Sequence, residues 1–141
     1  MPTRPVLVSS GKGLTQTILA GPHPLQADEP VEAEGQDLGP RPYELLLAAL
    51  GACTSITLRL YADHKDWPLD RVAVRLEHWK VEASTRRGRG EPVDEIKQVV
   101  VLVGDLSSAQ RNRLLEVAGK CPVHRTLARS LRIRTILGTE A

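Results

Sequence analysis

Residues 39–67 read GPRPYELLLAALGACTSITLRLYADHKDW, and this stretch decides the fold of the chain. Pro40 and Pro42 stand where a helix would begin, and Glu44 suits the positive end of a helix dipole. We expect a helix from about Pro42 to about His64, roughly 34 Å long, with the rest of the chain wrapped around it. Apolar or small residues recur at the spacing of one helix face. We expect that face to look into a core; its members are Leu46, Ala49, Leu50, Cys53, Ile56, Thr57 and Leu60.

Composition places the chain among single-domain proteins and excludes several classes. Its 141 residues suffice for one domain, residues 1–141, that buries a core. The sequence contains no Phe and only 3% aromatic residues, so a core of smaller side chains makes an interface with a second copy plausible. A net charge of +2 favours neither nucleic acid nor an acidic partner. We see no apolar run of membrane length and no signal peptide, and therefore expect a cytoplasmic protein without a membrane partner.

The remaining elements are expected in the order βββ-α-ββ-α-α-β. Short β-like runs fill residues 5–31, and two alternating strands at residues 71–83 and 96–106 form a hairpin around a basic loop at residues 84–92. Ser107 and Gln110 form a capping box for a helix that stops at Gly119. Cys121 precedes Pro122 at the start of a short helix, and residues 131–137 form a last strand. This order predicts an α+β domain with an antiparallel sheet around helices.

The two cysteines, Cys53 and Cys121, allow three interpretations. Both could be small core residues, as free cysteines often are. They could belong to a metal site, because Cys121 and His124 have C-x-x-H spacing, although no further cysteine or histidine pair completes it. They could form a redox pair in which one thiolate meets an oxidant and the other closes a disulfide.

Local electrostatics favour Cys121 as the thiolate. A helix N-terminus stabilises negative charge, and His124 lies one turn further on, where it could orient the thiol. Cys53 lies in the middle of its helix, and Glu44 and Arg41 precede it by about 13 and 18 Å along the axis. Any group that activates Cys53 must therefore come from another segment or another subunit.

The helix motif PYELLLAALGACTSITLRLYA, followed by KCPVHRTL, resembles the OsmC/Ohr family of osmotically inducible and organic hydroperoxide resistance proteins. The resemblance implies an OsmC-like fold: an intertwined homodimer with antiparallel β-sheet wrapped around two long central helices. It also implies a thiol-dependent peroxidase that reduces organic and other hydroperoxides and is reset by an external dithiol. We expect no cofactor and no metal. By position Cys53 matches the peroxidatic cysteine of the family and Cys121 the resolving cysteine, the reverse of the local ranking.

Two family positions differ in this chain. Family members use a glutamate ten residues before the peroxidatic cysteine, where this sequence has Tyr43, with Glu44 one place later. The family's arginine lies upstream of the helix, where Arg41 is the nearby candidate. We therefore weigh a second hypothesis, a non-catalytic ligand-binding or redox-sensing dimer that retains the fold and the cysteines.

Overall fold

The computed structural model describes residues 2–82 and 92–139. The chain divides into two compact units, Met1–Leu46 with Ile133–Ala141 and Leu47–Arg132. The long helix α1 (Pro42–His64) begins in the first unit and continues through the second. Both of its predicted ends are confirmed.

The first unit contains a three-stranded antiparallel sheet. Strands β1 (Val6–Ser9), β2 (Gln16–Ala20) and β3 (His23–Ala27) lie in chain order, as expected for short strands joined by turns. Ile18 stands opposite Val8 on one side and Leu25 on the other, and is itself buried. A 3₁₀ turn, η1 (Val31–Ala33), follows the sheet.

Asp28 anchors the loop that leads from this sheet to α1. Its side chain is buried, and its carboxylate accepts a hydrogen bond from the Thr15 hydroxyl at 2.8 Å. The backbone N–H groups of Glu29, Gln36 and Leu38 donate to the same carboxylate at 2.8, 3.3 and 3.3 Å. Burial would raise the pKa of Asp28, but these four hydrogen bonds outweigh it and hold the pKa below its usual value.

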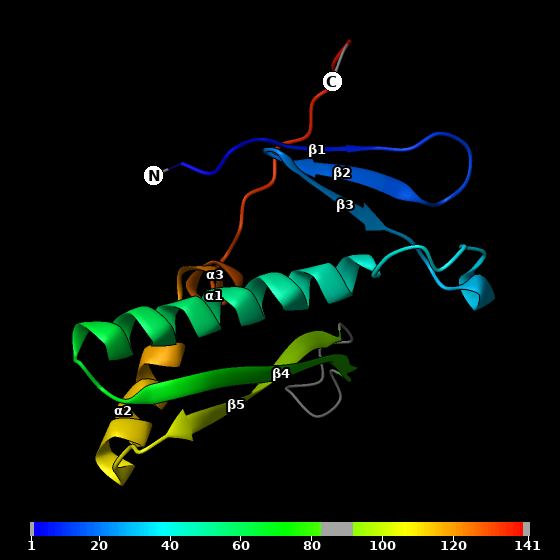
Figure 1. Cartoon of the computed structure of the whole chain (residues 1–141). Coiled ribbons are helices and arrows are strands. Elements are labelled where there is room, and N and C mark those ends of the chain that lie inside the picture. The colour runs from blue at the N-terminus through cyan, green and yellow to red at the C-terminus, as the bar shows by residue number, and fades with distance from the viewer. Residues whose placement is uncertain (1, 83–91, 140–141) are drawn as a thin grey trace. The chain divides into compact units, whose positions relative to one another are not determined.

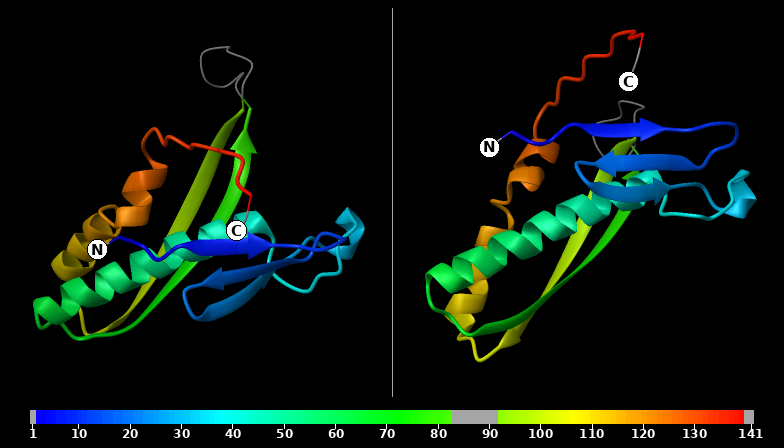
Figure 2. Two further views of the ribbon diagram at one scale, coloured as in Figure 1. Left: turned by 90° about the horizontal axis from the view of Figure 1, so that it is seen from above. Right: turned by 45° about the horizontal axis from the view of Figure 1, so that its top comes forward.

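The second unit combines α1 with a long hairpin and two shorter helices. Strands β4 (Leu69–Val81) and β5 (Val93–Gly104) pair antiparallel, and α2 (Ser108–Ala118) and α3 (Pro122–Leu127) follow. In this unit α1 runs along the twisted hairpin (Figures 1 and 2). Side chains from α1, α2 and the strand ends form its core, namely Leu58, Ala62, Leu69, Leu106, Leu114, Val117 and Ala118.

The predicted inward face of α1 is wrong in most positions. Ile56 and Leu60 are 59% and 65% exposed, and Leu46 and Ala49 are also exposed. The face that is buried consists of Leu50, Gly51, Thr54, Leu58 and Ala62. The helix carries small or apolar residues on both sides, so periodicity alone did not distinguish the side that packs on this chain's own hairpin.

The hydropathy of α1 differs from the sequence expectation, which found no apolar run of membrane length. With 23 residues the helix is long and apolar enough, by those two criteria alone, to cross a membrane. The core helix of a soluble protein meets the same criteria.

The local caps are confirmed, but the last strand is not formed. Ser107 and Gln110 make the reciprocal capping box of α2, and Cys121 is the N-cap of α3 with Pro122 in its first turn. Residues 131–137 pair with no strand among the described residues, so the predicted strand is wrong for the single chain. The loop predicted over residues 84–92 lies outside the described residues, apart from Pro92.

Neighbouring leucines of α2 test where the core lies. Leu114 is 0% exposed and Leu115 is 63% exposed. Leu114→Ala should lower the free energy of unfolding by about 3 kcal/mol, because it leaves a cavity among packed side chains. Leu115→Ala should change it by less than about 0.5 kcal/mol. Urea denaturation of the two variants measures the difference, and equal losses would contradict this core.

Asp28 should make the stability of the chain depend on pH. Its pKa is lowered on folding, so its contribution is fully present above the unfolded value of about 3.9 and is lost as the pH falls towards the folded value. Asp28→Asn should therefore have a lower free energy of unfolding than the wild type at neutral pH. This difference, the stability gap, should narrow below about pH 4. Urea titrations from pH 3 to pH 7 measure the gap, and a constant gap would exclude this role for the carboxylate.

Candidate active site

The structure brings the two cysteines together. Cys53 lies half-buried in the middle of α1, and Cys121 is fully buried at the start of α3. Their sulfur atoms are in hydrogen-bonding contact, and both thiols are free. Two residues far apart in the sequence therefore share one site within the second unit.

Backbone and side-chain donors surround the sulfur of Cys121. As N-cap residue it accepts a hydrogen bond from the His124 N–H at 3.4 Å, and the Val123 N–H and the Thr54 hydroxyl also reach it. Burial would raise the pKa of Cys121, but its hydrogen-bonding neighbours Cys53, His124, Thr54 and Val123 together lower it. Cys121 is thus prepared to carry negative charge.

Cys53 has the opposite tendency. Burial raises the pKa of its thiol, and the hydrogen bond and charge of Cys121 raise it further. The Val123 N–H and the Thr57 hydroxyl act against this increase without cancelling it. The order of acidity in the chain therefore agrees with local electrostatics: Cys121 is the more acidic thiol.

Two polar residues that sequence analysis missed complete the site. Thr54 is 0% exposed, and its Oγ1 lies 2.9 Å from Oε1 of Gln98 on β5. Each breaks a local pattern, since Thr54 is a polar residue on the buried face of α1 and Gln98 occupies an inward position of a valine-rich strand. A polar side chain at a buried position needs a partner, and that requirement could have identified both.

The other predicted site residues lie elsewhere or act differently. Arg41 forms an ion pair with Glu29, Nε to Oε2 at 2.9 Å, and Glu44 is exposed in the first turn of α1; all three belong to the first unit. His124 contacts Cys121 through its backbone N–H. The roles of Arg41, Glu44 and the His124 ring stay predictions.

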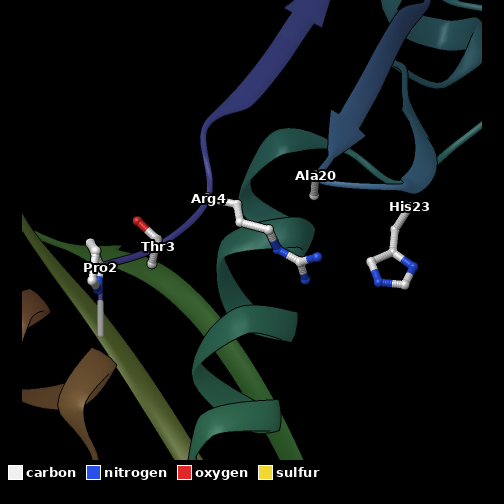
Figure 3. Close-up of a pocket in the computed structure, with 5 residues that line it drawn as sticks. All are labelled: Pro2, Thr3, Arg4, Ala20 and His23. Carbon is white, nitrogen blue, oxygen red and sulfur yellow. The ribbon is translucent and has the colours of Figure 1, made fainter.

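A hollow lies in the first unit. It has a volume of about 700 Å³ and is lined by Pro2, Thr3, Arg4, Ala20 and His23 (Figure 3). Neither cysteine lines it, so it does not belong to the thiol site. Within residues 2–82 and 92–139, no three His, Cys, Asp or Glu side chains are grouped as metal ligands.

Solved structures from several bacteria share this fold. An OsmC-like protein from Mycoplasma pneumoniae is 18% identical, with a TM-score of 0.72 over 91% of this chain and 88% of that one. An organic hydroperoxide resistance protein, OsmC, from Legionella pneumophila is 19% identical, with a TM-score of 0.65 over 90% and 89%. The organic hydroperoxide resistance protein OhrB of Bacillus subtilis is 20% identical, with a TM-score of 0.62 over 89% of each chain.

The sequence itself decides the family. No curated protein is similar enough to count as a match. The family model described as OsmC-like protein matches residues 35–136, a span that begins before α1 and includes both cysteines. More than half of the chain lies in this match, and the mixed α+β architecture with its long helix agrees with it. The chain therefore belongs to the OsmC-like family.

Proposed function

We propose that the protein is a cytoplasmic, thiol-dependent peroxidase that reduces organic hydroperoxides, with inorganic peroxide as a further substrate, through Cys53 and Cys121. The observation that carries the proposal is the contact between the sulfur atoms of half-buried Cys53 and buried Cys121. The family match and the hydroperoxide resistance proteins among the structural neighbours support a peroxide-related role in stress defence.

The proposed cycle has three steps. The thiolate of Cys53 attacks one peroxide oxygen, the O–O bond breaks, and an alkoxide leaves and takes up a proton as an alcohol. The thiolate of Cys121 then attacks the sulfenic acid of Cys53, so that an S–S bond forms and hydroxide leaves. An external dithiol reduces the disulfide by thiol exchange.

A second copy of the chain would complete the first step. The raised pKa of Cys53 leaves it mainly as a thiol in the single chain. Cys53 borders a stripe of exposed small and apolar residues on α1, Ala52, Ile56 and Leu60. We propose that a homodimer covers this stripe, and that Arg41 and Glu44 assist the peroxidatic thiolate, with a minor orienting role for His124.

One observation favours a second candidate function. A thiol whose pKa is raised reacts slowly with peroxide, because the thiolate is the nucleophile. A redox-sensing dimer, which needs the disulfide but no rapid turnover, fits the same pair of cysteines, and a ligand-binding dimer needs neither. Turnover distinguishes the two functions.

Reduced protein mixed with an organic hydroperoxide should lose two hydrogens per chain, as measured by intact mass, and should consume peroxide continuously when a dithiol is supplied. Cys121→Ser should stop at sulfenic acid on Cys53 and progress to over-oxidised forms. Cys53→Ser should lose turnover by at least about 100-fold, since it removes the nucleophile.

Three results would separate the hypotheses. A disulfide that forms once and then turns over slowly with dithiol would favour the redox sensor over the peroxidase. Thiols that stay reduced in excess peroxide would exclude both and leave ligand binding. Over-oxidation of Cys121 in the Cys53→Ser variant, with Cys53 left reduced in the Cys121→Ser variant, would reverse the two proposed roles.

A further inference from the structure

We propose that the buried Thr54 hydroxyl donates a hydrogen bond to the Cys121 sulfur, and that Gln98 is the positioning residue that turns this hydroxyl towards it. The pair would thereby prepare Cys121 to close the disulfide. The inference deepens the peroxidase proposal and rests on it for the oxidant that acts on Cys53.

The hydroxyl of Thr54 lies between an amide and a sulfur atom. Thr54 and Cys121 are both 0% exposed, so bulk solvent does not reach either side chain. The Thr54 hydroxyl donates to Oε1 of Gln98 at 2.9 Å, and its oxygen also reaches the sulfur of Cys121. A buried hydroxyl must direct its hydrogen to one of its neighbours, and here there are two.

The side-chain amide of Gln98 can accept or donate at the same place, because rotation by half a turn exchanges its oxygen and nitrogen. With Oε1 towards Thr54, the hydroxyl donates to the amide, and Cys121 can only offer its S–H to the hydroxyl oxygen. With Nε2 towards Thr54, the amide donates to the hydroxyl oxygen, and the hydroxyl hydrogen points at Cys121. The structure has the first arrangement, with Oε1 towards Thr54. A half-turn of the Gln98 amide gives the second, which is the one that matches a thiolate on Cys121.

The hairpin holds the amide in reach of α1. Gly51 lies one turn before Thr54, and a Cβ atom at Gly51 would stand 2.7 Å from Cδ1 of Leu76. Leu76 is the cross-strand partner of Gln98. The absence of a side chain at Gly51 therefore lets the helix approach the two residues that stand side by side on the hairpin.

The step that this arrangement serves is the attack of Cys121 on the sulfenic acid of Cys53. The thiolate of Cys121 supplies the electron pair for the new S–S bond, and the S–O bond of Cys53 breaks with loss of hydroxide. A donor to the sulfur raises the thiolate fraction about tenfold for each unit by which it lowers the pKa. It also reduces the intrinsic nucleophilicity by about threefold, so the net gain in rate is about threefold.

Thr54→Val tests the hydroxyl with almost no change of shape. In a Cys53→Ser background, absorbance of the thiolate at 240 nm should show a Cys121 pKa raised by about one unit. With both cysteines present, and at a pH at least one unit below the Cys121 pKa, disulfide closure should slow by about threefold. Gln98→Leu should change both quantities in the same direction, and its position on the hairpin makes it an independent variant if Thr54→Val fails to fold.

Two controls exclude a general effect on packing. Thr54→Ser keeps the hydroxyl and should retain the Cys121 pKa within about 0.3 unit. Thr57→Val changes the hydroxyl one turn further on, which faces Cys53, and should leave the Cys121 titration unaltered. Circular dichroism verifies the fold of each variant.

The closure rate is measured with organic hydroperoxide and, separately, with diamide, which oxidises thiols without peroxide. One outcome is a wild-type protein that fails to react with hydroperoxide but still forms the disulfide with diamide, at a rate that Thr54→Val lowers. That result would refute the peroxidase proposal and retain this inference. An unchanged Cys121 pKa and closure rate in both Thr54→Val and Gln98→Leu would overturn the inference, even in an active peroxidase.

Discussion

The close approach of α1 to the β4–β5 hairpin at Gly51 is the constraint on which the thiol site depends. One helical turn, Gly51 and Thr54, meets one cross-strand pair, Leu76 and Gln98, through a steric contact and a hydrogen bond. The first contact sets how closely the helix approaches the hairpin, and the second sets which face of the helix is turned towards it. Cys53 precedes Thr54 by about 100° of helical rotation and is therefore held at the edge of the buried face.

The start of α3 provides the second half of the site through its N-cap, which depends only on neighbouring residues. Pro122 presets the first helical turn, and the residue before it becomes the N-cap, whose side chain receives the free N–H groups of that turn. Here the N-cap is a cysteine, so donors that usually satisfy an oxygen stabilise a sulfur anion. The pKa values of the two thiols therefore shift in opposite directions. Cys121 has these donors, whereas Cys53 is partly buried in mid-helix with few donors to offset the burial.

Features that depend on neighbouring residues could be predicted from sequence, and features that depend on tertiary contacts could not. The ends of α1, the Ser107–Gln110 box and the Cys121 cap were correct because their causes lie within a few residues. The buried face of α1 was wrong, because a helix that is apolar on both sides gives no preference until the hairpin is in place. Residues 131–137 have a strand pattern but find no partner strand within residues 2–82 and 92–139, and alternation alone does not supply one.

The exposed stripe on α1 has a further consequence for Cys53. Covering Ile56 and Leu60 with a second copy removes apolar surface from water, which favours association, but it also desolvates the neighbouring thiol. Desolvation without a new partner would raise the pKa of Cys53 still further. A dimer in which Cys53 is the nucleophile must therefore bring a cation or hydrogen-bond donors to this sulfur. The chemistry proposed for Cys53 thus requires a complete assembly, whereas Cys121 carries its own stabilising donors in the single chain.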